Sequence, residues 1–377
     1  MDTGIFSFGT PKTPPTTKED DLSCLRLIRS RRVGPTTFHR LIAEHGSIAA
    51  ALDALPGIAR AAGIEDYTPC TIASAEAELR VGQRAGARLL RFDHPDYPDH
   101  LRQIDDAPPL LWLRGDPAWL TRQPLAVIGA RNTSSLGLRM ARGMAAALGE
   151  AGHCVVSGLA RGIDTAAHNA SLTTGTVAVM AGGIDVIYPA ENAILAAQIA
   201  EKGALVSELA PGTEPMARHF PMRNRIISGL AQAVIVIEAA HRSGSLLTAK
   251  NALDQGREVM AVPGHPMDAR AAGCNALIRD GATLVRSAAD VIAALAARRP
   301  PEAVDQPVQA APAPRPARVD SHEIEDRILS RLSPSPTEED MLIRDLGLSA
   351  AVLNPAIQSL ELQGRLTRLA GGRLALC

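Results

Sequence analysis

Between Pro124 and about Arg298, hydrophobic positions alternate between two spacings along the chain. Short unbroken apolar runs are followed by longer stretches in which apolar residues recur at the spacing of one helical face. This alternation is typical of a parallel sheet with helices on both faces, so we predict a doubly wound, Rossmann-like α/β domain. The runs predict strands at 125–129, 153–157, 176–181, 204–208, 233–238, 258–262 and 283–286, and the stretches predict helices near 135–150, 164–172, 191–202, 222–231, 245–255 and 273–279.

The pattern differs on the N-terminal side of this domain. Residues 1–20 are polar and rich in Pro and Thr, which predicts an unstructured leader. Residues 21–90 show helical spacing, and a glycine turn at Val33-Gly34-Pro35 lies between two of the predicted helices. We predict a SAM or helix-hairpin-helix-like domain that contacts the DNA backbone, although a small helical spacer with solvated arginines explains the pattern equally well.

A connector leads from this helical domain into the α/β domain. Several prolines between Arg91 and Asp116 exclude long helices there. We predict one strand at 110–113, with Tyr97 and Trp112 as packing anchors. Together with this connector, the α/β domain is expected to span residues 91–298.

The pattern also changes after the α/β domain. Residues 299–320 are rich in Pro and Ala without an apolar period, which predicts a linker. Within residues 321–377, helices at 322–332, 337–345 and 349–362 and a hairpin around Gly371-Gly372 predict a winged-helix domain. Because its last helix carries no Lys or Arg, we expect contact with a protein, or weak contact with duplex DNA, from this domain.

Composition narrows the function classes. The formal net charge is −1 and aromatic residues make up 3% of the chain, so nucleic-acid binding would need a local basic patch without rows of stacking rings. The cysteines are spread widely with no Cys-x-x-Cys pair, which offers neither a disulfide framework nor a zinc site. With no apolar run of membrane-spanning length and no secretory signal, we expect a cytoplasmic protein without membrane contact.

Ligands of doubly wound sheets bind outside the carboxyl ends of the strands, so the loops after the strands are where chemistry is expected. The first loop, Gly129-Ala130-Arg131, offers backbone N–H groups and a guanidinium at a helix N-terminus, a place that favours a phosphate. A dinucleotide-binding loop needs Gly-x-Gly-x-x-Gly, but Arg131 and Ser134 stand at the second and third glycine positions. We therefore expect an anion site, and no NAD, other cofactor or metal.

The second loop places Arg161 between Gly158 and Gly162. Asp164 and His168 follow on one helical face, and together they could form a catalytic base or metal pair. Because no third ligand or nucleophile is nearby, we interpret them instead as an N-cap and a polar partner that fix the loop.

The third loop holds the densest basic cluster of the domain, Arg218, His219, Arg223 and Arg225, at the start of a helix. We favour phosphate contact over simple solvation because ligands bind at this end of the sheet. Phe220 is the aromatic residue best placed to stack on a base, with core packing an equally good explanation.

The fourth loop, Ser243-Gly244-Ser245, is followed one helical turn later by Lys250. Small residues, hydroxyl donors and a cation suit a phosphate, although a plain helix start capped by Ser245 explains the same residues. Glu208 and Glu238 end two of the predicted strands. They are either catalytic carboxylates or ion-pair partners of the arginines.

Taken in order, the motifs of the central region resemble those of the DNA-processing protein A (DprA, also called Smf) family, over about Asp93 to Arg286. These motifs are GARNTSSLG, SGLARGIDTAAH, GGIDVIYPAEN, FPMRNRIISGL, EAAHRSGSLLTAKNAL, and VPGHP followed by GCNALIRDGATLV. The family builds its phosphate pocket from a Gly-Ser-Arg motif, which the resemblance places at residues 129–131. Ala130 departs from the serine, which removes one hydroxyl donor but no backbone N–H.

The resemblance implies a homodimeric recombination mediator that binds and protects single-stranded DNA and helps to load a RecA-type recombinase, in natural transformation or general recombination. We expect no catalysis. The main rival is a nucleoside-phosphate hydrolase of the lysine-decarboxylase-like Rossmann group, which is disfavoured because the glutamate of its motif is missing. The residues expected to bind DNA phosphates are Gly129, Ala130, Arg131, Gly158, Arg161, Gly162, Arg223, Arg225, Ser243, Gly244, Ser245 and Lys250, with Phe220 as the candidate for base stacking.

Overall fold

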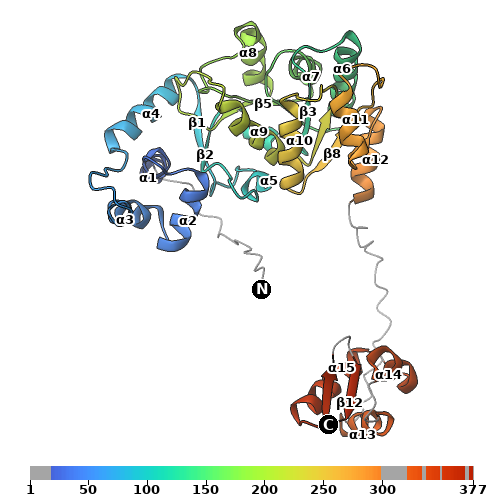
Figure 1. Ribbon diagram of the computed structural model, residues 1–377. Helices are drawn as coiled ribbons and strands as arrows, with labels where there is room; N and C mark the ends of the chain where they lie inside the picture. Colours follow the sequence, from blue (N-terminus) through green and yellow to red (C-terminus); the bar gives the residue numbers. More distant parts are fainter. Residues whose placement is uncertain (1–17, 299–320, 333–336, 349, 370–372, 377) are drawn as a thin grey trace, which may run out of the picture. The chain divides into compact units, whose positions relative to one another are not determined.

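The computed structural model describes residues 18–298, 321–332, 337–348, 350–369 and 373–376. The chain divides into two compact units, Met1–Pro300 and Pro301–Cys377 (Figure 1). Residues 1–17 of the expected leader and the whole expected linker lie outside the described residues. The first helix begins at Lys18, inside the segment expected to be the leader. No helix in the described ranges has the length and apolar character needed to cross a bilayer.

The first unit is built on a nine-stranded sheet in the order β1-β2-β6-β5-β4-β3-β7-β8-β9. From β6 to β9 neighbouring strands are parallel, whereas β2 is antiparallel to both β1 and β6. The doubly wound α/β fold is confirmed, although two antiparallel strands extend one end of the sheet. The strands are β1 (Arg88–Arg91), β2 (Leu110–Gly115), β3 (Leu125–Ile128), β4 (Val155–Ser157), β5 (Thr176–Val179), β6 (Ala204–Ser207), β7 (Ala233–Val236), β8 (Glu258–Ala261) and β9 (Thr283–Leu284).

The segment expected to be a connector is part of this sheet. It supplies β2, which pairs along its length with β1, a strand that the apolar pattern does not predict. β1 has the sequence Arg-Leu-Leu-Arg, too short and too polar at its ends to be distinguished from the end of the preceding helix. The strand predicted at 110–113 is confirmed as part of β2, and its pairing with β1 and β6 makes this part of the connector a strand of the sheet.

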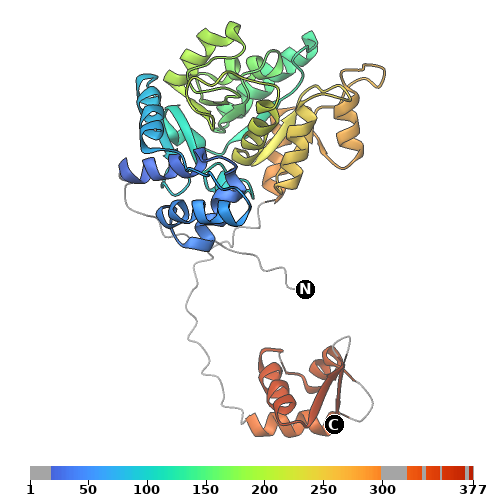
Figure 2. The same ribbon diagram turned by 60° about the vertical axis from the view of Figure 1, so that its left-hand side comes forward.

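Helices cover both faces of the sheet (Figures 1 and 2). They include two α-helices, α5 and α12, that the apolar pattern does not predict. The helices after β1 are α5 (Asp99–Arg102), α6 (Ser135–Glu150), α7 (Ile163–Ser171), α8 (Ala193–Lys202), α9 (His219–Leu230), α10 (Ser245–Asp254), α11 (Ala272–Arg279) and α12 (Ala288–Arg298), with short 3₁₀ helices η1 (Pro117–Leu120) and η2 (Ala190–Asn192).

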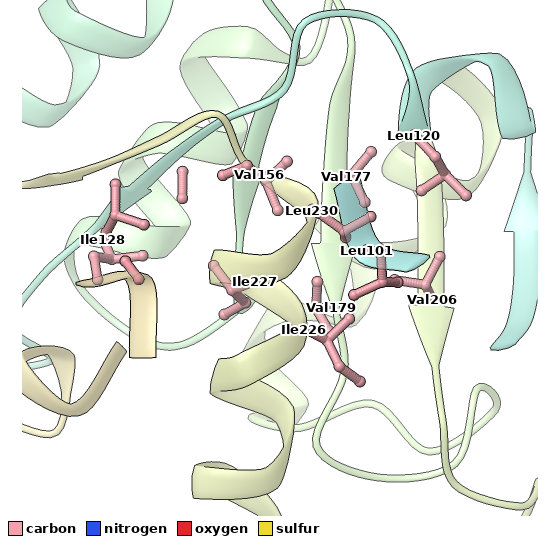
Figure 3. Packing of buried hydrophobic residues seen from close by; sticks show 14 of the residues in the cluster. Leu101, Leu120, Ile128, Val156, Val177, Val179, Val206, Ile226, Ile227 and Leu230 are labelled. Carbon is pink, nitrogen blue, oxygen red and sulfur yellow. The ribbon is translucent and has the colours of Figure 1, made fainter. Parts of the chain in front are cut away.

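Alternate residues of the strands enter two separate apolar layers. In β3, Leu125 and Val127 pack with α6, α7 and α12, whereas Ala126 and Ile128 pack with α9 and α10 on the opposite face. Burial on both faces explains why the strands read as continuous apolar runs. Figure 3 shows the α9 layer, in which helix and strand side chains meet: Ile128, Val156, Val177, Val179, Val206, Ile226, Ile227 and Leu230.

The N-terminal helices gather at the β1–β2 end of the sheet (Figure 1). They share a core with it: Trp112 of β2 is fully buried, and its indole N–H donates to the Glu78 carboxylate at 3.1 Å. Gly82 leaves room for the ring, since a Cβ there would lie 2.0 Å from it. Tyr97 is also buried, so the packing role predicted for both aromatic residues is confirmed. The helices are α1 (Lys18–Arg29), α2 (Pro35–His45), α3 (Ile48–Ala61) and α4 (Ile72–Arg84).

The second unit has the predicted winged-helix architecture. Its helices are α13 (Ser321–Arg331), α14 (Glu339–Leu346) and α15 (Ala350–Leu362), and its sheet has the order β10-β12-β11. The strands are β10 (Thr337–Glu338), β11 (Leu366–Leu369) and β12 (Arg373–Leu376), of which β10 is not predicted from the sequence. Ile328, Leu353 and Leu374 are among its fully buried core residues. The predicted break at 333–336 and the hairpin turn at 370–372 lie outside the described residues.

Candidate nucleic-acid interface

The strand order changes direction between β3 and β7, and a pocket opens there. From β3 the chain proceeds through β4 and β5 to β6 on one side, and through β7 to β8 and β9 on the other. At such a reversal the loops that follow adjacent strands diverge and leave a crevice at the carboxyl ends of the strands. A pocket of about 700 Å³ lies at this point, lined by the loops after β3, β4 and β7 and by the start of α9.

The predicted first loop forms one wall of this pocket. Gly129, Ala130 and Arg131 all line it, and Arg131 is exposed. The Arg131 guanidinium lies over the ring of Phe220 at 4.7 Å from the ring centroid. Phe220 also lines the pocket, so the structure brings together the loop arginine and the aromatic residue singled out in the sequence. A guanidinium that lies over a ring face keeps N–H groups free to donate to an anion.

Arg223 lies deeper in the same pocket. Arg223 is only 7% exposed. Its guanidinium lies against Gly158, where a Cβ would come within 1.6 Å of an Nη atom. Within the part of the chain that the structure describes, no carboxylate forms an ion pair with it and its buried Nε has no hydrogen-bond partner. The pKa of Arg223 is lowered to about 10, chiefly by burial. The Asp164 carboxylate raises this pKa and the charge of Arg131 lowers it. The guanidinium is therefore still charged at neutral pH.

The second loop is fixed by the two residues interpreted as its support. Asp164 accepts hydrogen bonds from the N–H groups of Gly158 at 3.1 Å and Ala160 at 3.4 Å. It lies inside α7 rather than at its N-cap, which is Gly162, so its side chain turns back to the loop. Burial raises the pKa of Asp164, and the charge of Arg223 lowers it.

His168 is the second support of this loop. It is fully buried, and burial lowers its pKa to about 3. Its Nε2 accepts from the Leu159 N–H at 3.3 Å, and its Nδ1 lies 2.7 Å from the hydroxyl of Thr176. Because that hydroxyl donates to the Val155 carbonyl, the hydrogen-bond pattern fits a neutral ring protonated at Nδ1.

The helix N-terminus expected to receive a phosphate is already occupied. The Glu238 carboxylate, at the end of β7, accepts from the Ser134 N–H at 2.9 Å and from the hydroxyls of Thr133 and Ser134. Gly137 leaves space for it, since a Cβ there would lie 2.0 Å from a carboxylate oxygen. The N–H of Ala130 donates to the Glu238 carbonyl at 2.7 Å. Glu238 thus binds the α6 N-terminus and the Ala130 N–H in this structure, an arrangement that does not fit the phosphate contact expected of them.

Arg225 points away from the pocket, although it lies only two residues from Arg223. Its guanidinium donates to both oxygens of Glu208 at 2.6 Å and pairs with Asp106 at 3.2 Å. Both Arg225 and Glu208 are buried, and Arg225 does not line the pocket. Its expected contact with phosphate does not fit this arrangement, because a carboxylate already holds the charge. Of the two roles left open for Glu208, the structure shows the ion pair.

Arg161 lies at the surface next to the pocket. Its Nε and one Nη each lie 2.9 Å from an oxygen of Glu191, and both side chains remain more than half exposed. This ion pair is open to water, so a phosphate can compete for the arginine. Gly162 adopts φ of +77° and packs against the Ala130 and Arg131 carbonyls, where a side chain would not fit.

The fourth loop forms the opposite wall. Ser243, Gly244 and Ser245 line the pocket, and the two serine hydroxyls lie 2.7 Å apart. The N-cap of α10 is Gly244 and not Ser245, because Ser245 is already the first residue of the helix. Lys250 is exposed and does not line the pocket.

Two further arginines, Arg242 and Arg270, line the pocket and were missed in the sequence. Arg242 is exposed and immediately precedes Ser243, so extending the fourth loop by one residue includes it. Arg270 lies 3.5 Å from the Glu238 carboxylate and 3.1 Å from Asp268. It comes from the segment between β8 and α11, and no local pattern in the sequence connects that segment to the pocket. Among the described residues, no group of His, Cys, Asp and Glu is arranged to hold a metal ion.

Comparison with known proteins gives the family. Residues 88–296, which include the whole pocket, match the model of DNA recombination-mediator protein A. The chain belongs to this family. Residues 18–81 match the DprA-like N-terminal HHH domain, and residues 309–372 match the DprA winged helix domain. The resemblance to the DprA/Smf family is therefore confirmed, and so are the helix-hairpin-helix and winged-helix domains.

Curated relatives and solved structures agree with this membership. The DNA processing protein DprA of Streptococcus pneumoniae is 46% identical to this chain over 199 residues, which cover 52% of this chain and 70% of the relative. The DNA processing protein DprA of Bacillus subtilis is 42% identical over a region that covers 58% of this chain and 75% of the relative. The S. pneumoniae structure covers 74% of this chain and 98% of its own with a TM-score of 0.62 and 34% identity. The Helicobacter pylori protein, described by its single-stranded DNA binding mode, covers 56% of this chain and 96% of its own with a TM-score of 0.52 and 26% identity. None of these comparisons favours the nucleoside-phosphate hydrolase.

Proposed function

We propose that this chain binds the backbone of single-stranded DNA in the pocket between β3 and β7. The observation that carries the proposal is Arg223: a buried, charged guanidinium without an ion-pair partner among the described residues, open to a pocket whose rim carries Arg131. A buried charge is unfavourable unless an opposite charge compensates it. The Asp164 carboxylate acts on the Arg223 charge but forms no ion pair with it. A phosphate entering the pocket supplies that charge and meets both arginines.

The arginines around the pocket suit a polyanion better than a single small anion. Arg131, Arg242 and Arg270 line the pocket with Arg223, and Arg161 lies on the neighbouring loop. Arg161 and Arg270 are paired with carboxylates, but both side chains remain about half exposed or more, so a phosphate can compete for them. The chain as a whole has a formal charge of −1, so this local concentration of positive charge supplies the attraction. Ser243 and Ser245 add hydroxyl donors on the opposite wall. Arg225 and Lys250, expected from the sequence to contribute, have no part in the proposed site.

Membership of the family supports a wider role. The chain acts as a DNA recombination mediator that protects single strands and helps to load a RecA-type recombinase, in natural transformation or general recombination. It works as a homodimer, which places two such pockets on one strand and increases binding through the higher local concentration of the second site. The role is that of a binding protein without catalysis, located in the cytoplasm.

The test is equilibrium binding of the full chain to a fluorescent oligonucleotide, single-stranded and as a duplex. Arg131→Ala should weaken binding to the single strand at least tenfold, since a hydrogen bond to a charged group contributes about 1.5–3 kcal/mol. The matched control is Arg142→Ala, because Arg142 is exposed on α6 and does not line the pocket. Equal losses for both variants, or no loss for Arg131→Ala, would refute the proposed site.

A further inference from the structure

An aromatic residue outside the pocket extends the site on its outer side. Tyr188, in the loop between β5 and η2, packs against Phe220 with the two ring centroids 5.8 Å apart and the planes at 65°. Phe220 therefore contacts both Arg131, whose guanidinium lies over its ring, and Tyr188. Little of the Phe220 ring is left open for a nucleobase, and the residue is only partly exposed.

Tyr188 has the free surface that Phe220 lacks. Half of the residue is exposed. No hydrogen bond to its hydroxyl is formed by any of the described residues. The loop comes from the carboxyl end of β5, which lies at the same edge of the sheet as the pocket loops.

The segment that follows Tyr188 is held by contacts with neighbouring loops. Asn192, four residues further on, donates to the Leu159 carbonyl at 2.9 Å and to the Thr165 hydroxyl at 2.8 Å. Glu191 is joined to Arg161 by the surface ion pair described above. An aromatic ring that is fixed before binding loses little conformational freedom when a base stacks on it.

We propose that Tyr188 stacks on a nucleobase of the bound strand, with Phe220, which contacts both Tyr188 and Arg131, as the positioning residue. The inference rests on the proposed function, because it concerns the nucleotide whose phosphate Arg131 binds. A nucleotide carries its phosphate and base on one sugar, and the two contacts lie next to one ring. Stacking of this kind accepts all bases, since each has a flat π-face.

The experiment compares two strands of equal length and charge, an oligothymidine and an oligomer of abasic sites. Tyr188→Ala in the full chain should weaken binding to the oligothymidine by roughly tenfold, within the range known for stacking on one base, and leave binding to the abasic strand unchanged. Tyr188→Phe should restore wild-type binding, because stacking needs the ring and not the hydroxyl. Ile194→Ala, at a more exposed apolar residue of the next helix, is the matched control and should have no effect.

The outcomes separate the inference from the proposed function. If the wild type binds neither strand, the proposed function fails and Tyr188 has no role in it. If the wild type binds both strands and Tyr188→Ala changes neither, or weakens both equally, the stacking role is overturned while the phosphate site stands. The salt dependence gives a second readout: Tyr188→Ala should keep the wild-type slope, since no charge is lost. A shallower slope would assign Tyr188 to backbone contact instead.

Discussion

Replacing Gly158 by alanine tests whether the buried Arg223 guanidinium binds DNA. A Cβ at Gly158 would lie 1.6 Å from one Nη atom of Arg223, 2.4 Å from Cζ and 2.7 Å from the other Nη. Separations below 3 Å are far inside van der Waals contact, so the whole guanidinium must move out of its position. The variant thereby displaces the charge without deleting it, and the net charge of the protein stays the same.

The size of the effect follows from the hydrogen bond that the displaced guanidinium can no longer donate to a phosphate. A hydrogen bond to a charged group contributes about 1.5–3 kcal/mol, so single-strand binding should weaken roughly 10- to 160-fold. The slope of log affinity against log salt should become shallower by about 0.7, the value for one phosphate on a single strand. Overpacking in a filled site also costs about 1–3 kcal/mol of folding stability, which a denaturant melt measures separately.

The chain offers a matched control. Gly143, within α6, has no atom within 4 Å of the position that a Cβ would take. Gly143→Ala should keep wild-type binding and gain about 0.5–1 kcal/mol in the free energy of unfolding, as expected for a helix-interior glycine. Fluorescence anisotropy with a labelled oligonucleotide over a range of salt concentrations measures affinity and slope together. Wild-type affinity and slope in a folded Gly158→Ala protein would refute a phosphate-binding role for Arg223.

Three further predictions concern neighbouring residues. Glu191→Gln should strengthen single-strand binding severalfold in the anisotropy assay, because it frees Arg161 from its exposed ion pair; weaker binding would show that the pair supports the site. Arg225→Met should lower the free energy of unfolding by about 3–5 kcal/mol in a denaturant melt, because Glu208 is left buried without its partner; a binding defect without lost stability would contradict the structural role. His168 has its folded pKa lowered from 6.5 to about 3, so the unfolded chain binds a proton between these values that the folded chain does not. The stability that the neutral His168 contributes is present above pH 6.5 and is lost as the pH falls towards 3, by about 1.4 kcal/mol per pH unit. Denaturant melts from pH 4 to 7 should therefore show a weaker pH dependence of the unfolding free energy for His168→Gln than for the wild type. Parallel curves for the two proteins would contradict this prediction.

The apolar pattern predicts the sheet core well, because strands buried on both faces must be apolar at every position. β3 and β7 are both read correctly for this reason. β1 is missed because its two leucines are flanked by arginines, and only pairing with β2 makes it a strand. The order of the strands in the sheet fixes the switch point, the point where that order reverses. This order depends on which distant segments pair, and the sequence of one segment does not contain that information.

The site shows the same division between local and distant information. Arg131 and Arg223 are brought together as expected, because both belong to segments at the carboxyl ends of strands. Arg225 was misassigned because Glu208, which holds it, lies on another strand. The α6 N-terminus, where a phosphate was expected, instead binds Glu238, which follows the neighbouring strand β7. In both cases, the deciding partner is distant in the sequence.

The most direct measurement of the central claim is the salt dependence of single-strand affinity for the wild type and Arg131→Ala. If fixed arginines at the switch point hold the DNA backbone, the wild-type affinity falls linearly on a double-logarithmic plot, and the variant shows a slope shallower by about 0.7. Affinity that does not change with salt, or identical slopes for the two proteins, would contradict it.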